Sequence, residues 1–123
     1  MATTVKFVQN GSGLVTAALA SSTNKYCSMG TGGTTATDGD TAMGTEVEAR
    51  TSGTQSQVTT DHSNDTYQVV GEVAATAGRA IIEAGLHSAS TEGTLMARAS
   101  FDAINLDSGD SIEFTWKIKF PHS

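Results

Sequence analysis

Residues 111–120 alternate strictly between polar and apolar side chains, and this pattern constrains the fold more than any other feature of the chain. The apolar positions are Ile112, Phe114, Trp116, Ile118 and Phe120, and they alternate with Ser111, Glu113, Thr115, Lys117 and Lys119. A period of two is typical of a β-strand with one buried face, because successive side chains point to opposite sides of a sheet. The sequence therefore predicts a β core in which this strand buries its apolar side chains.

Other short segments of the same kind are separated by residues that favour turns. We expect strands at 3–8, 25–28, 45–50, 55–60, 67–74, 80–86 and 94–101, while the alanine-rich residues 14–19 fit either a strand or a short helix. Turns are expected at 61–65, within a β-hairpin, at 88–93 and at 107–110, and a long loop at 30–44. About eight short antiparallel strands predict an all-β fold, a two-sheet β-sandwich of jelly-roll-like form.

One domain is expected to account for all of residues 1–123, with residues 1–13 as an N-terminal arm. A chain of this length buries about two-thirds of its unfolded surface, which is enough for an independent core. The single cysteine, Cys27, has no partner for an internal disulfide. We interpret it as a small buried hydrophobic residue in a protein assembled in a reducing cytoplasm.

The charge balance argues against nucleic acid as a partner. The formal net charge is -6 and the sequence pI is about 4.8, so a basic patch that could neutralise phosphates is lacking. The sequence has no apolar run of the roughly 18–20 residues that a membrane span requires, and residues 1–10 lack the apolar run of a signal peptide. We expect a soluble, non-secreted protein with neither nucleic acid nor membrane as a partner.

Catalytic motifs are weak. The chain has three histidines but no Gly-x-Ser-x-Gly elbow and no spacing that favours a Ser/His/Asp triad; the histidines are His62, His87 and His122. Cys27 lies in no signature of a nucleophilic cysteine. The sequence therefore predicts no enzyme.

Metal and cofactor motifs are equally weak. The histidines are not closely paired, which argues against zinc. Aspartates beside glycine offer oxygen ligands for calcium but lack the EF-hand pattern, and we interpret them as turn formers; they are Asp38, Asp40, Asp107 and Asp110. Residues 30–33 are glycine-rich without the Gly-Lys-Ser/Thr ending of a phosphate loop, which indicates flexibility. We expect no metal and no cofactor.

Glu83 is the charged residue that most needs an explanation. It lies in an apolar strand, Ile81 to Leu86, whose two faces both look covered, and an unpaired buried carboxylate costs several kcal/mol. Arg98, in the facing strand, and Arg50 are its candidate partners. The alternatives are a catalytic acid with a raised pKa and a structural ion pair, and we favour the ion pair because no second acid or base accompanies Glu83.

Four blocks of sequence carry a resemblance to a known group of proteins. They are MGTEVEAR at 43–50, IIEAGL at 81–86, GTLMAR at 93–98 followed by Phe101, and GDSIEFTW at 109–116. In this order, over roughly residues 25–120, the chain resembles small capsid decoration, or cement, proteins of tailed bacteriophages. The resemblance implies a non-enzymatic β-rich homo-oligomer, most often a trimer or a dimer, that binds the major capsid protein on the outer capsid surface of the virion.

Other functions stay open. The block at 81–86, followed by a glycine turn and an apolar strand, is also similar to modules of phage tail-fibre proteins. A small glycan-binding sandwich is a further alternative, although aromatic residues are only 6% of the chain. A hydrolase is the most distant alternative.

The N-terminal segment is a candidate interface. Val5 and Phe7 share one face of the expected strand at 3–8, and the sequence Asn-Gly-Ser-Gly at 10–13 predicts a flexible hinge behind it. Such a terminal strand can join the sheet edge of an adjacent subunit or of the capsid shell. An ordinary edge strand of its own sandwich is the alternative.

Overall fold

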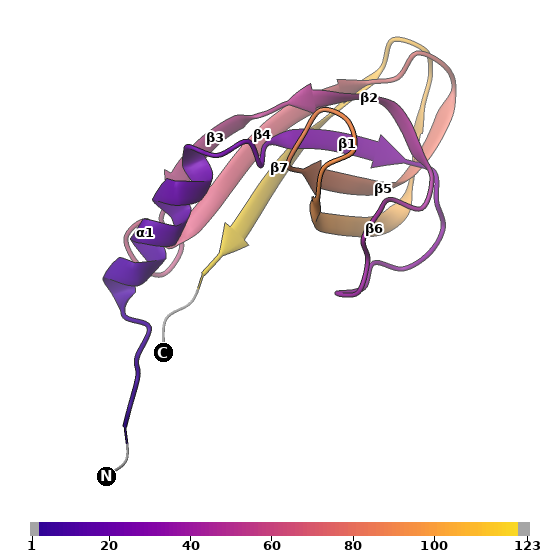
Figure 1. Cartoon of the computed structure of the whole chain (residues 1–123). Helices are drawn as coiled ribbons and strands as arrows, with labels where there is room; N and C mark the ends of the chain where they lie inside the picture. The colour runs from indigo at the N-terminus through magenta and orange to yellow at the C-terminus, as the bar shows by residue number, and fades with distance from the viewer. Residues whose placement is uncertain (1–2, 121–123) are drawn as a thin grey trace.

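The computed structural model describes residues 3–120 and consists of one helix and seven strands (Figure 1). They follow one another as α1 (Gln9–Ala20), β1 (Tyr26–Gly30), β2 (Glu46–Ser52), β3 (Thr54–Val58), β4 (Thr66–Ala74), β5 (Arg79–His87), β6 (Leu95–Leu106) and β7 (Ser111–Lys119). The strands expected from sequence are found close to their expected bounds, apart from the first and from β6, which continues five residues beyond its expected end at residue 101. Residues 14–19, expected as either a strand or a short helix, belong to α1. The expected long loop is also present, between β1 and β2.

The strands form two antiparallel sheets, which confirms the all-β two-sheet sandwich. Sheet A has the order β2-β1-β5-β6 and sheet B the order β3-β4-β7. The hairpin expected around residues 61–65 joins β3 to β4, and Asp65 closes its turn by accepting the backbone N–H groups of Thr60, Asp61 and His62. A jelly roll has eight strands in two Greek keys, whereas residues 3–120 carry seven strands.

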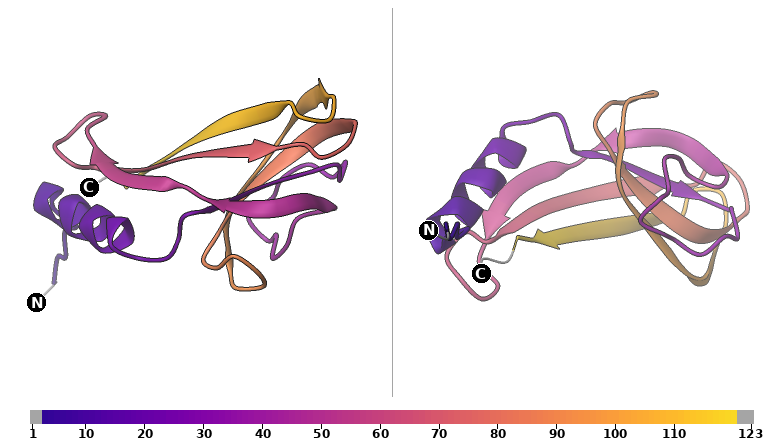
Figure 2. Two further views of the ribbon diagram at one scale, coloured as in Figure 1. Left: turned by 90° about the horizontal axis from the view of Figure 1, so that it is seen from above. Right: turned by 60° about the horizontal axis from the view of Figure 1, so that its bottom comes forward.

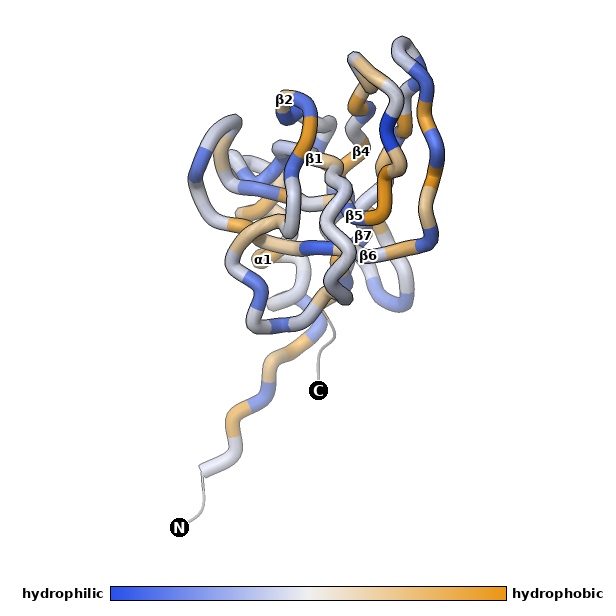
Figure 3. Tube along the Cα trace, turned by 90° about the vertical axis from the view of Figure 1, so that its right-hand side faces the viewer, coloured by the Kyte–Doolittle hydropathy of each residue, from blue (hydrophilic) through white to orange (hydrophobic). Residues whose placement is uncertain are grey.

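The expected first strand, residues 3–8, is wrong. These residues have no regular structure and lie exposed, and the segment leaves the body of the domain in Figure 3, where hydrophobic and hydrophilic stretches alternate along it. The expected hinge at 10–13 is wrong as well, because these residues lie inside α1.

Tertiary contacts explain why a segment with two glycines becomes helical. Ser12 and Thr16 are both fully buried: Ser12 Oγ donates to the carbonyl of Phe120 at 2.7 Å, and Thr16 Oγ1 donates to the carbonyl of Asn64 at 2.7 Å. The helix is thereby docked at the end of sheet B, against β3 and β4 (Figure 2). Packing outweighs the low helix propensity of glycine here.

The core lies between the sheets. Its buried members are Cys27, Met29, Tyr67, Val69, Val73, Ala75, Ile81, Leu86 and Leu106. Cys27 is a buried free thiol, as expected, and burial raises its pKa to about 11. The Tyr67 hydroxyl donates to the carbonyl of Asn24 at 2.6 Å, so this buried phenol has a partner.

Strand β7 keeps the expected alternation but buries its apolar face only in part. Each of its apolar positions is intermediate in exposure and packs against the edge of the core. The physical reason is its position, because β7 is the outer strand of sheet B and pairs with β4 alone within residues 3–120. The chain's strongest strand signal therefore belongs to an edge and not to the centre of the core.

Candidate functional site

The outer face of sheet A carries a buried polar cluster. On β1 and β5 the core face holds Cys27, Met29 and Leu86. Since side chains alternate along a strand, Ser28, Glu83 and His87 lie on the opposite face. All three are at most 2% exposed, because the loop at 31–45 covers that face.

Glu83 is the anchor of this loop. Its carboxylate accepts backbone N–H groups from both ends of the loop: Gly32 at 2.7 Å, Gly44 at 2.8 Å and Thr45 at 2.7 Å. Arg98 Nε and Nη2 both lie 2.9 Å from Glu83 Oε1. A single side chain thus closes a long loop at both ends and joins it to β6.

The electrostatics fit a permanently charged carboxylate. Burial raises the pKa of Glu83, but hydrogen bonds from the backbone of Thr45, Gly44 and Gly32 and from Arg98 outweigh it and hold the pKa below its ordinary value. Burial lowers the pKa of Arg98, and its bonds to Glu83 and Asp40 raise it above the ordinary value. Glu83 is therefore unsuited to act as a proton donor near neutral pH, which disfavours the catalytic-acid alternative.

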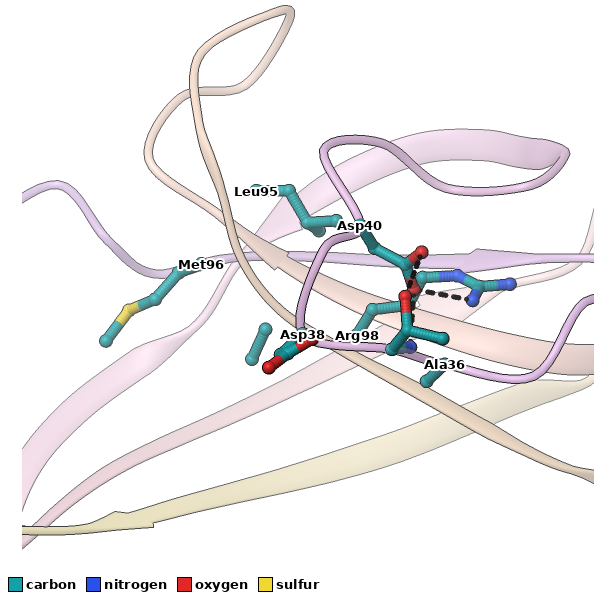
Figure 4. A pocket seen from close by; sticks show the side chains of 8 residues that line it. Ala36, Asp38, Asp40, Leu95, Met96 and Arg98 are labelled. Atoms are coloured by element: carbon teal, nitrogen blue, oxygen red, sulfur yellow. Dashed lines mark hydrogen bonds and ion pairs between the residues drawn. The ribbon is translucent and has the colours of Figure 1, made fainter.

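Arg98 extends the cluster into the middle of the loop. Its Nη1 lies 3.0 Å from Asp40 Oδ2, and its Nη2 donates to the carbonyl of Thr34 at 2.9 Å. Figure 4 shows the Asp40 carboxylate joined to the guanidinium while Asp38 points away from it. A hollow of about 480 Å³ opens here between the loop and the start of β6, and one of about 410 Å³ lies by Gly33 and Phe101.

Glycines allow the loop ends to close against Glu83. A Cβ at Gly32 would lie 2.5 Å from Glu83 Oε2 and 2.6 Å from the Cα of Gly44, and a Cβ at Gly44 would lie 3.1 Å from the Cα of Gly32. These glycines serve close backbone approach. The flexibility that the sequence suggested for residues 30–33 is therefore a wrong interpretation.

Arg50, the other candidate partner of Glu83, lies elsewhere. Its Nε is 2.9 Å from Glu46 Oε2, and its Nη1 donates to the carbonyls of Ala89 and Glu92 at 2.9 and 2.8 Å. It thus holds the turn between β5 and β6 against β2. Arg98 is the partner that the structure selects, and Arg50 is not.

The structure brings together one pair that the sequence did not indicate. Ser28 Oγ and His87 Nε2 are 2.7 Å apart, and they meet because Ser28 is paired with Gly85, which has no side chain between them. Burial, followed by nearby Arg50, lowers the pKa of His87. Ser28 is only 1% exposed and no carboxylate hydrogen-bonds to the His87 ring within residues 3–120, so the pair lacks what a nucleophile needs. The signal that could have revealed this pair is the glycine at position 85, two residues before His87 on the same face of β5, which leaves room for the side chain of Ser28.

The remaining candidates are dispersed. Asp40 accepts from the backbone N–H of Thr37, and Asp110 accepts from that of Asp107, so both act as turn formers. In the part of the chain described, no three His, Cys, Asp or Glu side chains gather as metal ligands would. His62 lies in the turn between β3 and β4, His87 is the last residue of β5, and His122 lies outside the described residues.

A second polar cluster surrounds a β-bulge in β2. Cys27 pairs with Thr51 and Met29 with Val47, so β2 carries extra residues opposite Ser28. One of these, Glu48, has φ +66° and accepts from the backbone N–H of Thr76 and from Arg79 Nε. These bonds lower its pKa in spite of partial burial, the Thr76 N–H being the largest cause. The bulge ties β2 to the β4–β5 turn.

Apolar side chains are exposed in the N-terminal segment before α1, away from the polar clusters of sheet A, and in part along β7. Val5 is 87% exposed and Phe7 41%, with the Phe7 ring lying over Gly11 at the start of α1. The two candidate interface residues therefore face solvent, but not from a strand. On β7, the Trp116 indole N–H is buried and is the one such side-chain atom without an acceptor in residues 3–120.

Comparison with protein-family models, with curated proteins and with solved structures finds no match. Among the described residues, no helix is long and apolar enough to cross a lipid bilayer.

Proposed function

We propose that this chain is a non-enzymatic structural protein of a tailed-phage virion, a capsid decoration protein that bridges major capsid subunits on the outer surface of the head. The observation that carries the proposal is the kind of surface the domain offers. The buried charges of Glu83 and Arg98 are paired with each other, whereas the apolar side chains at residues 3–8 and along β7 are exposed in part. Such a surface suits contact with proteins.

The resemblance of the sequence supports the same role. Three of its four blocks meet at one place: Gly44 and Thr45 from the first, Glu83 from the second and Arg98 from the third are hydrogen-bonded together. The fourth block forms most of β7. The residues that carry the resemblance thus build a rigid module and its edge, which are the parts a bridging protein requires.

Glycan binding draws less support. Sugar sites use exposed aromatic faces, but Tyr67 is fully buried and Trp116 packs against the core. A module of the tail or tail fibre would need the same kind of surface, and the binding experiment below distinguishes that role from decoration of the head.

Purified protein added to expanded heads that lack a decoration protein should co-sediment with them and raise the temperature at which they release DNA. Cryo-microscopy should then show one density per lattice site on the outer surface. Bovine serum albumin at equal concentration controls for trapping. Binding to tails and not to heads, or to neither, would refute the decoration role.

A further inference from the structure

The free edge of β7 carries an electrostatic defect. In the β4–β7 register, Glu113 lies directly opposite Glu72. Both side chains are exposed, and within residues 3–120 neither forms an ion pair. Like charges directly opposite each other destabilise an antiparallel pair. A cation arriving on the other side of β7 would relieve the repulsion.

The N-terminal segment has the complementary pattern. Val5 and Phe7 alternate with Thr4 and Lys6, and the segment is exposed. Val8, at its end, is in the extended region, with φ -92° and ψ 165°. The segment is thus free to pair, and its last residue already has the backbone conformation of a strand.

We propose that residues 3–8 of one copy of this chain add as an antiparallel strand to the free edge of β7 in a second copy, with Lys6 opposite Glu113. In this register Val5 lies opposite Phe114, Phe7 opposite Ile112 and Thr4 opposite Thr115. Apolar positions face apolar ones and the charges are opposite in sign. Backbone hydrogen bonds supply affinity, as in other cases of strand addition.

The segment cannot reach this register in its own chain. The hydrogen bond from Ser12 Oγ to the carbonyl of Phe120 places the start of α1 beside the far end of β7. Glu113 lies about 23 Å back along the strand, whereas the chain from Ser12 to Lys6 spans at most about 15 Å. Folding back would set Lys6 beside Lys117 or Lys119, where like charges repel. The partner is therefore a second copy.

This contact needs only two copies of the chain and does not depend on the virion role. It joins different surfaces of the two copies, so it can be repeated around a closed ring or exchanged within a dimer. Disulfide trapping tests it in the full-length protein.

One chain carrying Lys6→Cys is mixed with another carrying Glu113→Cys under mild oxidation. Directly opposed strand residues lie within disulfide range, so a disulfide-linked dimer should form. The wild-type chain controls for Cys27, and a Lys6→Cys chain mixed with a Lys117→Cys chain controls for register. Absence of the Glu113 product, or equal yield with Lys117→Cys, overturns the proposal. So does an intramolecular disulfide in a Lys6→Cys/Lys117→Cys double variant.

Light scattering provides a second measurement without any disulfide. The wild-type protein should be oligomeric. Lys6→Glu should weaken its association by about 2- to 5-fold, and combining Lys6→Glu with Glu113→Lys should restore the association. Both side chains are exposed, so circular dichroism should show that each variant folds. A monomer at every accessible concentration, or a swap that fails to restore association, overturns the proposal.

Discussion

The covered face of sheet A and the free edge of sheet B treat their polar groups in opposite ways. Around Glu83, a buried carboxylate finds three backbone N–H groups and a guanidinium within its own chain. Along β7, a pair of glutamates faces each other and an indole N–H has no acceptor in the described residues. The first region is complete in one copy. In the second region the exposed pair of like charges is open to a cationic partner, so the comparison separates what holds the domain together from what it offers to others.

The largest effect is expected from a substitution in the buried polar cluster on sheet A. Glu83→Gln removes the fully buried one of the two carboxylates that pair with Arg98, whose side chain is only 2% exposed. Loss of one partner of a buried pair typically costs about 3–5 kcal/mol. Urea unfolding should show a reduction of that order. Asp102→Asn, an exposed control on β6, should stay within about 0.5 kcal/mol, and an equal loss in both variants would contradict the anchoring role of Glu83.

The pH dependence of the same pair sharpens this result. The folded pKa of Glu83 lies below its ordinary value, so its contribution to stability is complete above the unfolded pKa, about 4.3, and is lost as pH falls through the folded value. The stability gap between wild type and Glu83→Gln should therefore be widest near neutral pH and narrow below about pH 4. A gap that widens in acid would contradict the assignment.

A smaller effect is expected from the glycines that close the loop. Gly32→Ala brings a Cβ to 2.5 Å from Glu83 Oε2, whereas a Cβ at Gly39, in the same loop, meets nothing within 4 Å. Gly32→Ala should lower the free energy of unfolding by about 1–3 kcal/mol. Gly39→Ala should leave it unchanged or raise it slightly. Equal effects would show that the loop end is not held closely against Glu83.

The smallest effect compares the core with the free edge. Ile81 is fully buried, whereas Ile118 on β7 is intermediate in exposure. Ile81→Val should cost about 0.5–1.5 kcal/mol and Ile118→Val less than about 0.5. Both are measured at low protein concentration, where a partner is absent. A cost at Ile118 that equals the cost at Ile81 under those conditions would show that the β7 face is already covered within one chain.

Strand periodicity was sufficient to predict most of the fold. Alternation located β7 and the hairpin of β3 and β4, and an apolar strand around a single carboxylate indicated an ion pair of Glu83 with Arg98 or Arg50, of which the structure has Arg98. Of helix α1, only residues 14–19 were considered as a short helix, with a strand as the alternative. Its first turns were missed because they contain two glycines, with the apolar Val8 as N-cap and no side-chain cap. Its stability comes from Ser12 and Thr16 bonding to distant carbonyls, which local sequence does not reveal.

The candidate site was predictable in one contact and not in the others. Arg98 lies on the strand that pairs with the strand of Glu83, so the pair follows from hairpin geometry. The backbone donors Gly32, Gly44 and Thr45 come from a loop without regular pattern, and glycine there could equally have meant freedom of movement. Only the arrangement in space shows that the glycines are needed for close contact.

Cys27 gives the protein a built-in reporter of its own opening. The only thiol in the chain is fully buried, its pKa is raised to about 11, and a Cβ at Gly71 would lie 2.6 Å from its sulfur. Thiolate is the reactive form of cysteine, and the thiol of Cys27 is covered by β4 and kept protonated by burial. Alkylating reagents can therefore modify it only when β1 and β4 separate. The rate of alkylation by iodoacetamide therefore reads out the opening of the sandwich in the unmodified chain, without an added probe.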